Sequence, residues 1–278
     1  MTDSDFELAA NVSLLFPEVP FFDRFAAAAK AGFRSAESWW QFDGPVPSES
    51  DLDEFLTAIG VSGLSLSGMN LWAGDMPGGE RGVVSHPART RDFEANLEVV
   101  VEIALATGCR LFNALYGQRV PGETPESQDR TAVANLSAAV RMLARVSGTV
   151  LVEPLSLGLN GDYPLVTVAD ALGVIRSVRE ATGLDNIALL FDTFHLANNG
   201  EELVSAVHRA GEYIGHVQFA DTPGRGEPGT GTIDFPSVLE ALQTVGYAKS
   251  VACEYIPSTA TIETLSWIGA MPQLRPLH

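Results

Sequence analysis

The sequence predicts an α/β protein that folds as a (β/α)₈ TIM barrel, with residues 1–278 in a single domain. Short apolar segments with the character of strands alternate with helical segments eight times along the chain, which is the repeat of such a barrel. The strand segments are apolar on both faces, as in a parallel sheet covered by helices, and 278 residues fit one barrel domain. A doubly wound open sheet is the alternative, because the order of elements does not show whether the sheet closes.

The first half of the chain supplies four strand–helix pairs. The strands are apolar or loosely alternating runs, and we expect them at residues 6–15, 33–39, 61–68 and 110–114. The helices show an alanine-rich run, a Ser-Asp-Leu-Asp-Glu capping signature or a helical apolar period, and we expect them at residues 23–31, 50–59, 89–107 and 126–146. A long glycine-rich loop at residues 70–87 follows the third strand and carries Trp72 and Arg81.

The second half repeats the pattern with shorter loops. Its strands include the runs TVLVE, IALLFD and SVACE, and we expect them at residues 149–153, 187–192, 214–220 and 250–254. Its helices, two of which end at glycines, are expected at residues 167–182, 200–209, 234–244 and 262–268. The segment DTFHLANNG lies just beyond the sixth strand, between the predicted strand and the next predicted helix.

Charge and composition exclude several classes of partner. The chain has 35 acidic and 17 basic residues, a net charge of −18, whereas nucleic acids and anionic membranes require clustered Lys and Arg.

The start, MTDSDFELAA, lacks the basic residues and apolar core of a signal peptide, so we expect a cytoplasmic protein. Cys109 and Cys253 lack CxxC spacing and are expected to be small buried side chains. A homo-oligomer is possible.

Polar side chains lie at the predicted carboxyl ends of four neighbouring strands, where barrels hold their active sites. These residues are Glu153, Asp192, Gln218 and Glu254. Buried carboxylates need a neutralising partner, and oxygen ligands suit Mg²⁺ or Mn²⁺ better than zinc. The sequence therefore predicts a divalent metal site. The alternative for each acid is that it caps a helix or pairs with Arg225.

Further candidates surround these four residues. His195 lies three residues after Asp192 and could donate to a substrate hydroxyl or carry a proton, although it could also be a histidine at a helix N-terminus or a packing residue. His216 lies two residues before Gln218, one step deeper on the same face, where it could orient a ligand. Arg225 lies in the loop GRGEPG, which lacks the helix of a dinucleotide site, and offers a cation to an anionic substrate group.

Five segments of the chain are distinctive: AGDMPGGERG, LVEPLS, LLFDTFH, GHVQFADTPGRGEPGTGTIDF and CEY. Together they resemble the hydroxypyruvate isomerase family, which belongs to the xylose isomerase-like superfamily of sugar isomerases and epimerases. The resemblance spans residues 6–267. It implies that Glu153, Asp192, Gln218 and Glu254 bind the metal, with Glu153 and Glu254 also the catalytic acid/base pair. It further implies that substrate contacts involve His195, Arg225, Glu37, Asn70 and Trp72.

The sequence departs from the family pattern at two places. Ser156 and Leu157 follow Glu-Pro where the family usually has Asn and often His, and Gly68-Met69 precede Asn70 where a His is common. Both changes remove polar groups from the mouth of the barrel. The substrate is therefore the property that the resemblance defines least.

The resemblance implies an aldose–ketose isomerase that acts through an enediolate on hydroxypyruvate and tartronate semialdehyde, or on a related 2-oxo sugar acid. A ketose 3-epimerase and an inosose-type dehydratase, which is a lyase, are alternatives on the same metal site. A non-catalytic sugar-binding barrel is a third, and an endonuclease is disfavoured by the charge. The loop at residues 70–87 could close as a lid or form a rigid surface. Of Trp39 and Trp40, we expect one to line the pocket and the other to pack.

Overall fold

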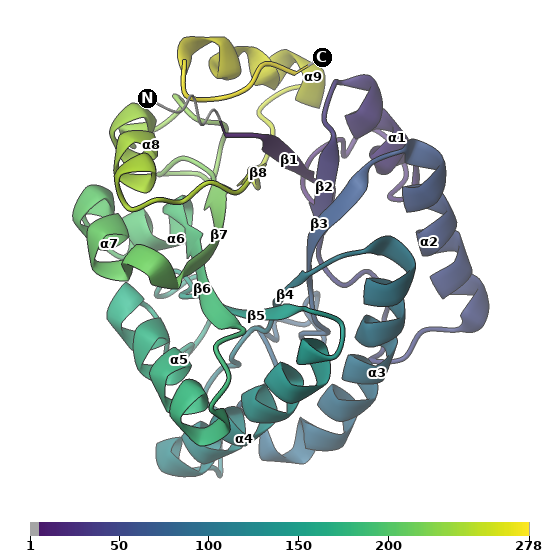
Figure 1. The fold of residues 1–278 in the computed structure, drawn as a ribbon, viewed down its shortest axis with the longest axis vertical. Helices are drawn as coiled ribbons and strands as arrows, with labels where there is room; N and C mark the ends of the chain where they lie inside the picture. Colours follow the sequence, from purple (N-terminus) through teal and green to yellow (C-terminus); the bar gives the residue numbers. More distant parts are fainter. Residues whose placement is uncertain (1–5, 278) are drawn as a thin grey trace.

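A closed barrel of eight parallel strands forms the centre of the computed structural model, which describes residues 6–277 (Figure 1). The strands are β1 (Leu8–Asn11), β2 (Ser35–Ser38), β3 (Ser65–Asn70), β4 (Leu111–Asn113), β5 (Thr149–Val152), β6 (Ile187–Asp192), β7 (Ile214–Phe219) and β8 (Val251–Cys253). Each strand pairs with the next, and β1 pairs with β8, which closes the sheet. The predicted TIM barrel is confirmed, and the open sheet is excluded.

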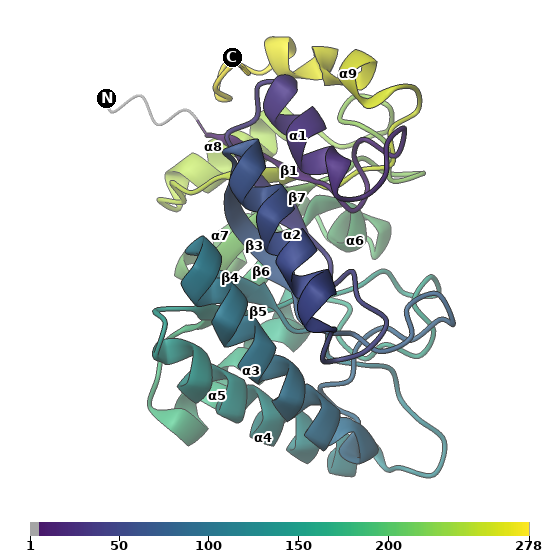
Figure 2. The same ribbon diagram turned by 90° about the vertical axis from the view of Figure 1, so that its right-hand side faces the viewer.

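Helices surround the barrel as an outer layer (Figure 1). They are α1 (Asp23–Lys30), α2 (Glu49–Ser62), α3 (Thr90–Thr107), α4 (Pro125–Ala144), α5 (Val168–Thr182), α6 (Thr193–Asn198), α7 (Leu203–Ala210), α8 (Phe235–Thr244) and α9 (Thr261–Thr264), with 3₁₀ turns at Pro87–Arg89, Gly211–Tyr213 and Leu265–Ala270. Figure 2 shows the long loops that connect strands to helices extending from one side of the barrel. Within residues 6–277, no helix has both the length and the apolar character that crossing a membrane requires.

The boundary between α2 and β3 differs from the prediction. The helix continues to Ser62, and β3 starts at Ser65 rather than at residue 61. The β-branched Val61 favours a strand by propensity, but in the structure it lies on the helix with 83% of its surface exposed. The helix ends at Gly63, whose left-handed conformation (φ 75°) costs glycine no steric strain.

The segment after β6 is a short helix, α6, which is not among the helices predicted above. Asp192 ends β6 and caps α6, because its side chain accepts hydrogen bonds from the backbone N–H groups of Phe194 and His195. At six residues, α6 is too short to show a helical apolar period in the sequence. The consequence is that a helical turn, and not a flexible loop, fixes the direction of His195.

The two cysteines are fully buried, as expected from the sequence. Burial raises the pKa of Cys109 to about 12 and that of Cys253 further still, so neither forms a thiolate near neutral pH. We expect a thiol reagent such as DTNB to leave the native protein unlabelled and to label two thiols after unfolding in guanidinium. Rapid labelling of the native protein would show that one of these segments opens readily.

Candidate active site

A buried polar residue lies at or next to the carboxyl end of every strand. In strand order, these residues are Asn11, Glu37, Asn70, Asn113, Glu153, Asp192, Gln218 and Glu254. Six of them are sequence candidates, whereas Asn11 and Asn113 are not. The same signal, a polar residue that ends an apolar strand, marks the positions of both, although it does not indicate their hydrogen-bond partners.

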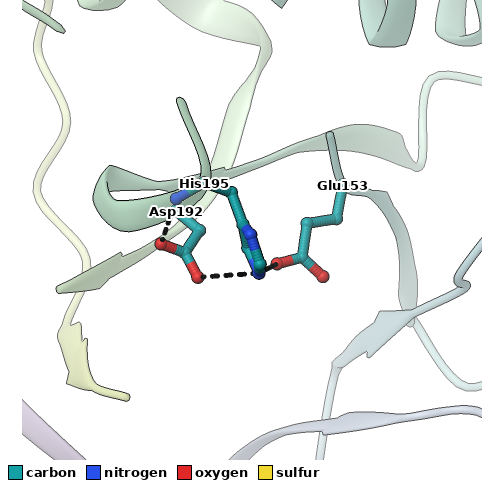
Figure 3. Close-up of side chains that lie close together, drawn as sticks. All are labelled: Glu153, Asp192 and His195. Atoms are coloured by element: carbon teal, nitrogen blue, oxygen red, sulfur yellow. Dashed lines mark hydrogen bonds and ion pairs between the residues drawn. The ribbon is translucent and has the colours of Figure 1, made fainter. Parts of the chain in front are cut away.

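Glu153, Asp192 and His195 form a buried cluster at the ends of β5 and β6, and their potential ligand atoms lie within 4.8 Å of one another. Figure 3 shows the imidazole of His195 between the two carboxylates. Its Nε2 lies 3.9 Å from Oε1 of Glu153 and 3.7 Å from Oδ2 of Asp192. Asp192 uses Oδ1 to cap α6, at 2.7 Å from the backbone nitrogen of Phe194, and this leaves Oδ2 directed towards the cluster.

Ser156 determines which nitrogen of His195 carries the proton. The backbone N–H of Ser156 donates to Nδ1 over 3.0 Å, so Nδ1 is an acceptor and Nε2 carries the hydrogen. Burial, the largest influence, lowers the pKa of His195 to about 4, which keeps the ring neutral. His195 can therefore donate a hydrogen bond from Nε2. The same protonation makes it a poor metal ligand, because a ligating nitrogen must be free of hydrogen.

Glu254 lies outside this cluster and is held by residues from three other elements. Its Oε1 accepts hydrogen bonds from Nε1 of Trp39 over 2.7 Å and from Nδ2 of Asn11 over 2.9 Å. Its Oε2 pairs with the guanidinium of Arg225, which also lies 3.5 Å from Oδ2 of Asp192. The rings of Trp39 and Phe194 flank this guanidinium. Arg225 thus links the cluster to Glu254.

The site holds more negative charge than Arg225 neutralises. Burial, followed by repulsion from Glu254 and Asp192, raises the pKa of Glu153 well above its ordinary range. Burial also raises the pKa of Glu254 to about 8, although Arg225 opposes this shift. Three buried carboxylates that repel one another favour the binding of a positive ion among them.

Gln218 supplies a further oxygen. Its Oε1 is buried without a hydrogen-bond partner, while its Nε2 donates to Oε1 of Glu37 over 2.7 Å. In the β6–β7 ladder Gln218 is paired with Asp192, so the two lie at the same depth in the barrel. Carboxylate and amide oxygens at one mouth, one of them unpartnered, fit a divalent metal.

The remaining candidates lie in two places. Asn70 and Trp72 line a cavity of about 1180 Å³ together with His195 and Arg225, and Arg89 stacks on the Trp72 ring. Glu37 does not line this cavity. Its carboxylate lies deeper, where it is bonded to Asn11, Gln218 and His216. His216 therefore contacts Glu37, and reaches Gln218 only through it.

Trp39 and Trp40 both line the cavity, so the expectation that one of them only packs is wrong. Trp40 is 8% exposed and also packs edge-on against Phe42. Trp39 reaches Glu254 with its indole N–H.

The model of the xylose isomerase-like TIM barrel family matches residues 25–271. A putative hydroxypyruvate isomerase of Streptomyces coelicolor is 42% identical over 96% of this chain and 97% of its own length. The hydroxypyruvate isomerase of Escherichia coli is 33% identical, with 94% of this chain and 97% of its own length covered. A 2-oxo-tetronate isomerase of Haemophilus influenzae is 32% identical, with the same shares covered.

Among solved structures, a protein from Brucella melitensis described as an AP endonuclease of family 2 superposes with a TM-score of 0.86. It is 31% identical, and the match covers 95% of this chain and 98% of that one.

Proposed function

Because the chain belongs to the xylose isomerase-like TIM barrel family, we propose that it is a divalent-metal-dependent isomerase of short sugar acids. It is an isomerase enzyme, as are its named relatives. The proposed substrate pair is hydroxypyruvate and tartronate semialdehyde, or a related 2-oxo sugar acid. The observation that carries the proposal is the group of buried carboxylates, with two raised pKa values, at the carboxyl ends of neighbouring strands.

Glu153, Asp192, Gln218 and Glu254 would hold Mg²⁺ or Mn²⁺, which polarises the carbonyl and the adjacent hydroxyl of the substrate when bound. One of the two glutamates, Glu153 or Glu254, removes the proton from the carbon that bears the hydroxyl, which gives an enediolate. The other returns a proton to the neighbouring carbon, and the hydroxyl proton passes to the oxygen of the former carbonyl, so that no atom is gained or lost. The pKa of Glu254, raised to about 8, supports this, because a group with a pKa near the working pH can both accept and release a proton. The Nε2–H of His195 donates to a substrate oxygen on which charge develops.

Proton exchange followed by NMR tests this function. The purified protein is incubated with Mg²⁺ or Mn²⁺ in D₂O and with hydroxypyruvate, short 2-oxo acids, ketoses and inososes in turn. We expect deuterium incorporation together with a new aldehyde signal for a 2-oxo acid. Absence of exchange with every compound in the presence of either ion would rule the proposal out.

A ketose 3-epimerase is the second candidate, because the cavity is much larger than a three-carbon acid needs. Its volume is about 1180 Å³, and the rings of Trp39, Trp40 and Trp72 form part of its wall, as aromatic side chains do in sugar sites. The same experiment separates the two functions. Exchange into a ketose with inversion at the carbon that exchanges would identify an epimerase, and loss of water would identify a dehydratase.

Arg81 is the residue best placed to recognise the carboxylate of a sugar acid. It lines the cavity, its Nη1 donates only to the backbone oxygens of Met76 and Glu80, and no carboxylate in residues 6–277 pairs with it. Arg225, by contrast, is already shared between Asp192 and Glu254. We expect Arg81→Met to raise KM for an acidic substrate by roughly 10- to 100-fold with a small effect on kcat, since a charge-assisted hydrogen bond contributes about 1.5–3 kcal/mol.

The matched control is Arg91→Met, the same change at an exposed position of α3 that does not line the cavity. It should leave both constants unchanged. Equal KM values for wild type and Arg81→Met would show that the carboxylate binds elsewhere.

A further inference from the structure

Glu37 is the centre of a buried hydrogen-bond network beneath the proposed metal site. We propose that Glu37 is a positioning residue: its carboxylate fixes the amide of Gln218 so that Oε1 is the atom available to the ion, and it restrains Glu254 through Asn11. This inference rests on the proposed function, because the ion belongs to that function.

The register of the barrel brings these residues together from distant parts of the chain. Asn11 pairs with Glu37 in the β1–β2 ladder. On the other side of β1, Ala10 pairs with Cys253, so Asn11 is level with Glu254. Glu37 and Gln218 are 181 residues apart in sequence, yet their side chains meet across the interior of the barrel. Glu37 is 3% exposed, so water cannot replace these partners.

Both oxygens of Glu37 are occupied. Oε1 accepts from Nδ2 of Asn11 over 2.8 Å and from Nε2 of Gln218 over 2.7 Å. Oε2 lies 2.5 Å from Nε2 of His216. An ionised carboxylate can only accept hydrogen bonds, so all three neighbours must present N–H groups to it.

This requirement selects one of the two orientations of the Gln218 amide. If the amide turned over, Oε1 of Gln218 would face Oε1 of Glu37, and two acceptors would lie at hydrogen-bond distance without a proton between them. The selected orientation leaves Oε1 of Gln218 buried and without a partner. An unpartnered buried carbonyl costs free energy, and a cation recovers that cost.

Asn11 extends the restraint to Glu254. Its Nδ2 donates both to Oε1 of Glu37 and to Oε1 of Glu254, over 2.8 and 2.9 Å. Its own Oδ1 accepts from the backbone N–H of Ser13, which fixes the side chain. Glu37 is therefore connected to two of the four proposed ligands, Gln218 directly and Glu254 through one amide.

The test is a double-mutant cycle on metal affinity, with Mn²⁺ binding measured by the EPR signal of the free ion. In wild type, Glu37→Gln allows either amide orientation at Gln218, and we expect the Kd for Mn²⁺ to rise about 10- to 100-fold. Gln218→Glu places a second carboxylate against Glu37. In the Gln218→Glu background, Glu37→Gln removes the repulsion between the two carboxylates. A carboxylate at position 218 presents an oxygen to the ion in every orientation. Glu37→Gln should therefore leave the Kd for Mn²⁺ unchanged or lower it in this background.

A positioning role thus predicts that Glu37→Gln raises the Kd for Mn²⁺ in wild type but not in the Gln218→Glu background. A purely structural role predicts that Glu37→Gln weakens Mn²⁺ binding in both backgrounds. Glu94→Gln, on the exposed face of α3, is the matched control and should leave the Kd unchanged. If Glu37→Gln alone does not fold, Mn²⁺ binding is measured in the double variant Glu37→Gln/Gln218→Glu instead. If that variant folds but does not bind Mn²⁺, the inference is overturned. An unchanged Kd in Glu37→Gln overturns only the role of Glu37. Absence of Mn²⁺ binding in wild type overturns the metal dependence of the proposed function as well.

Discussion

Replacement of either Glu153 or Glu254 by glutamine is expected to lower kcat by about 10³-fold or more. A glutamine retains the size of the side chain but cannot exchange a proton, and a positioned acid or base contributes about 10²- to 10⁴-fold. Both residues are also proposed ligands, so the loss should lie at the upper end of that range. Steady-state turnover of hydroxypyruvate is the measurement.

The two variants should also differ from each other. In D₂O, the variant that retains the base should still exchange the substrate proton without forming product, whereas the variant without the base should do neither. Glu98→Gln, on the exposed face of α3, is the control and should retain wild-type turnover. Turnover within tenfold of wild type in either site variant would remove that glutamate from the mechanism.

Removal of divalent metal is expected to abolish activity and to lower the melting temperature. Dialysis against EDTA should leave only background turnover, and Mg²⁺ or Mn²⁺ should restore it. An ion at 100 times its Kd stabilises the folded state by about 2.7 kcal/mol, which corresponds to a rise in Tm of roughly 5 °C for a chain of this size. Full activity in EDTA would contradict the proposal.

The rise in Tm that the metal ion produces should depend on pH, and the raised pKa of Glu254 determines in which direction. Burial raises the pKa of Glu254 from an ordinary 4.5 to about 8, so between these values the folded state holds a proton that the unfolded chain has lost. The stability of the EDTA-treated protein therefore falls as pH rises over this range. Because the ion competes with that proton, the rise in Tm on adding metal should be larger at pH 8 than at pH 6. Calorimetry at the two pH values, with and without metal, checks this.

The fold and the positions of the acidic residues could be predicted because both depend on local sequence. A strand that ends in Glu or Asp is visible in the chain, and parallel strands bring their carboxyl ends to one mouth. The contacts of Glu37 could not be predicted, because they depend on which side chains meet across the closed barrel. The sequence places Glu37 among the substrate contacts, whereas the structure gives its two oxygens to Asn11, Gln218 and His216.

The hydrogen-bond partners of Asn11 and Asn113 likewise could not be predicted from the sequence. An asparagine at the end of a strand is common in turns, so its type alone does not indicate a site. In the structure, Asn11 joins two glutamates, and Asn113 donates to Oε2 of Glu153 over 2.7 Å. The role of each depends on a carboxylate that lies far away in the sequence.

The anchor of His195 has a consequence for how this barrel can change its substrate. The main-chain N–H of Ser156, which every residue except proline possesses, donates to Nδ1, and the Ser156 hydroxyl lies 2.8 Å from the same nitrogen. Because the main-chain N–H is enough to make Nδ1 an acceptor, we expect that the side chains of Leu157 and Leu159 can change while the proton on Nε2 stays in place. Leu157 is already 67% exposed, and Leu159 lines the cavity. We expect substrate selectivity in this loop to evolve separately from the proposed hydrogen bond of His195, because a main-chain group holds the imidazole and the neighbouring side chains face the cavity.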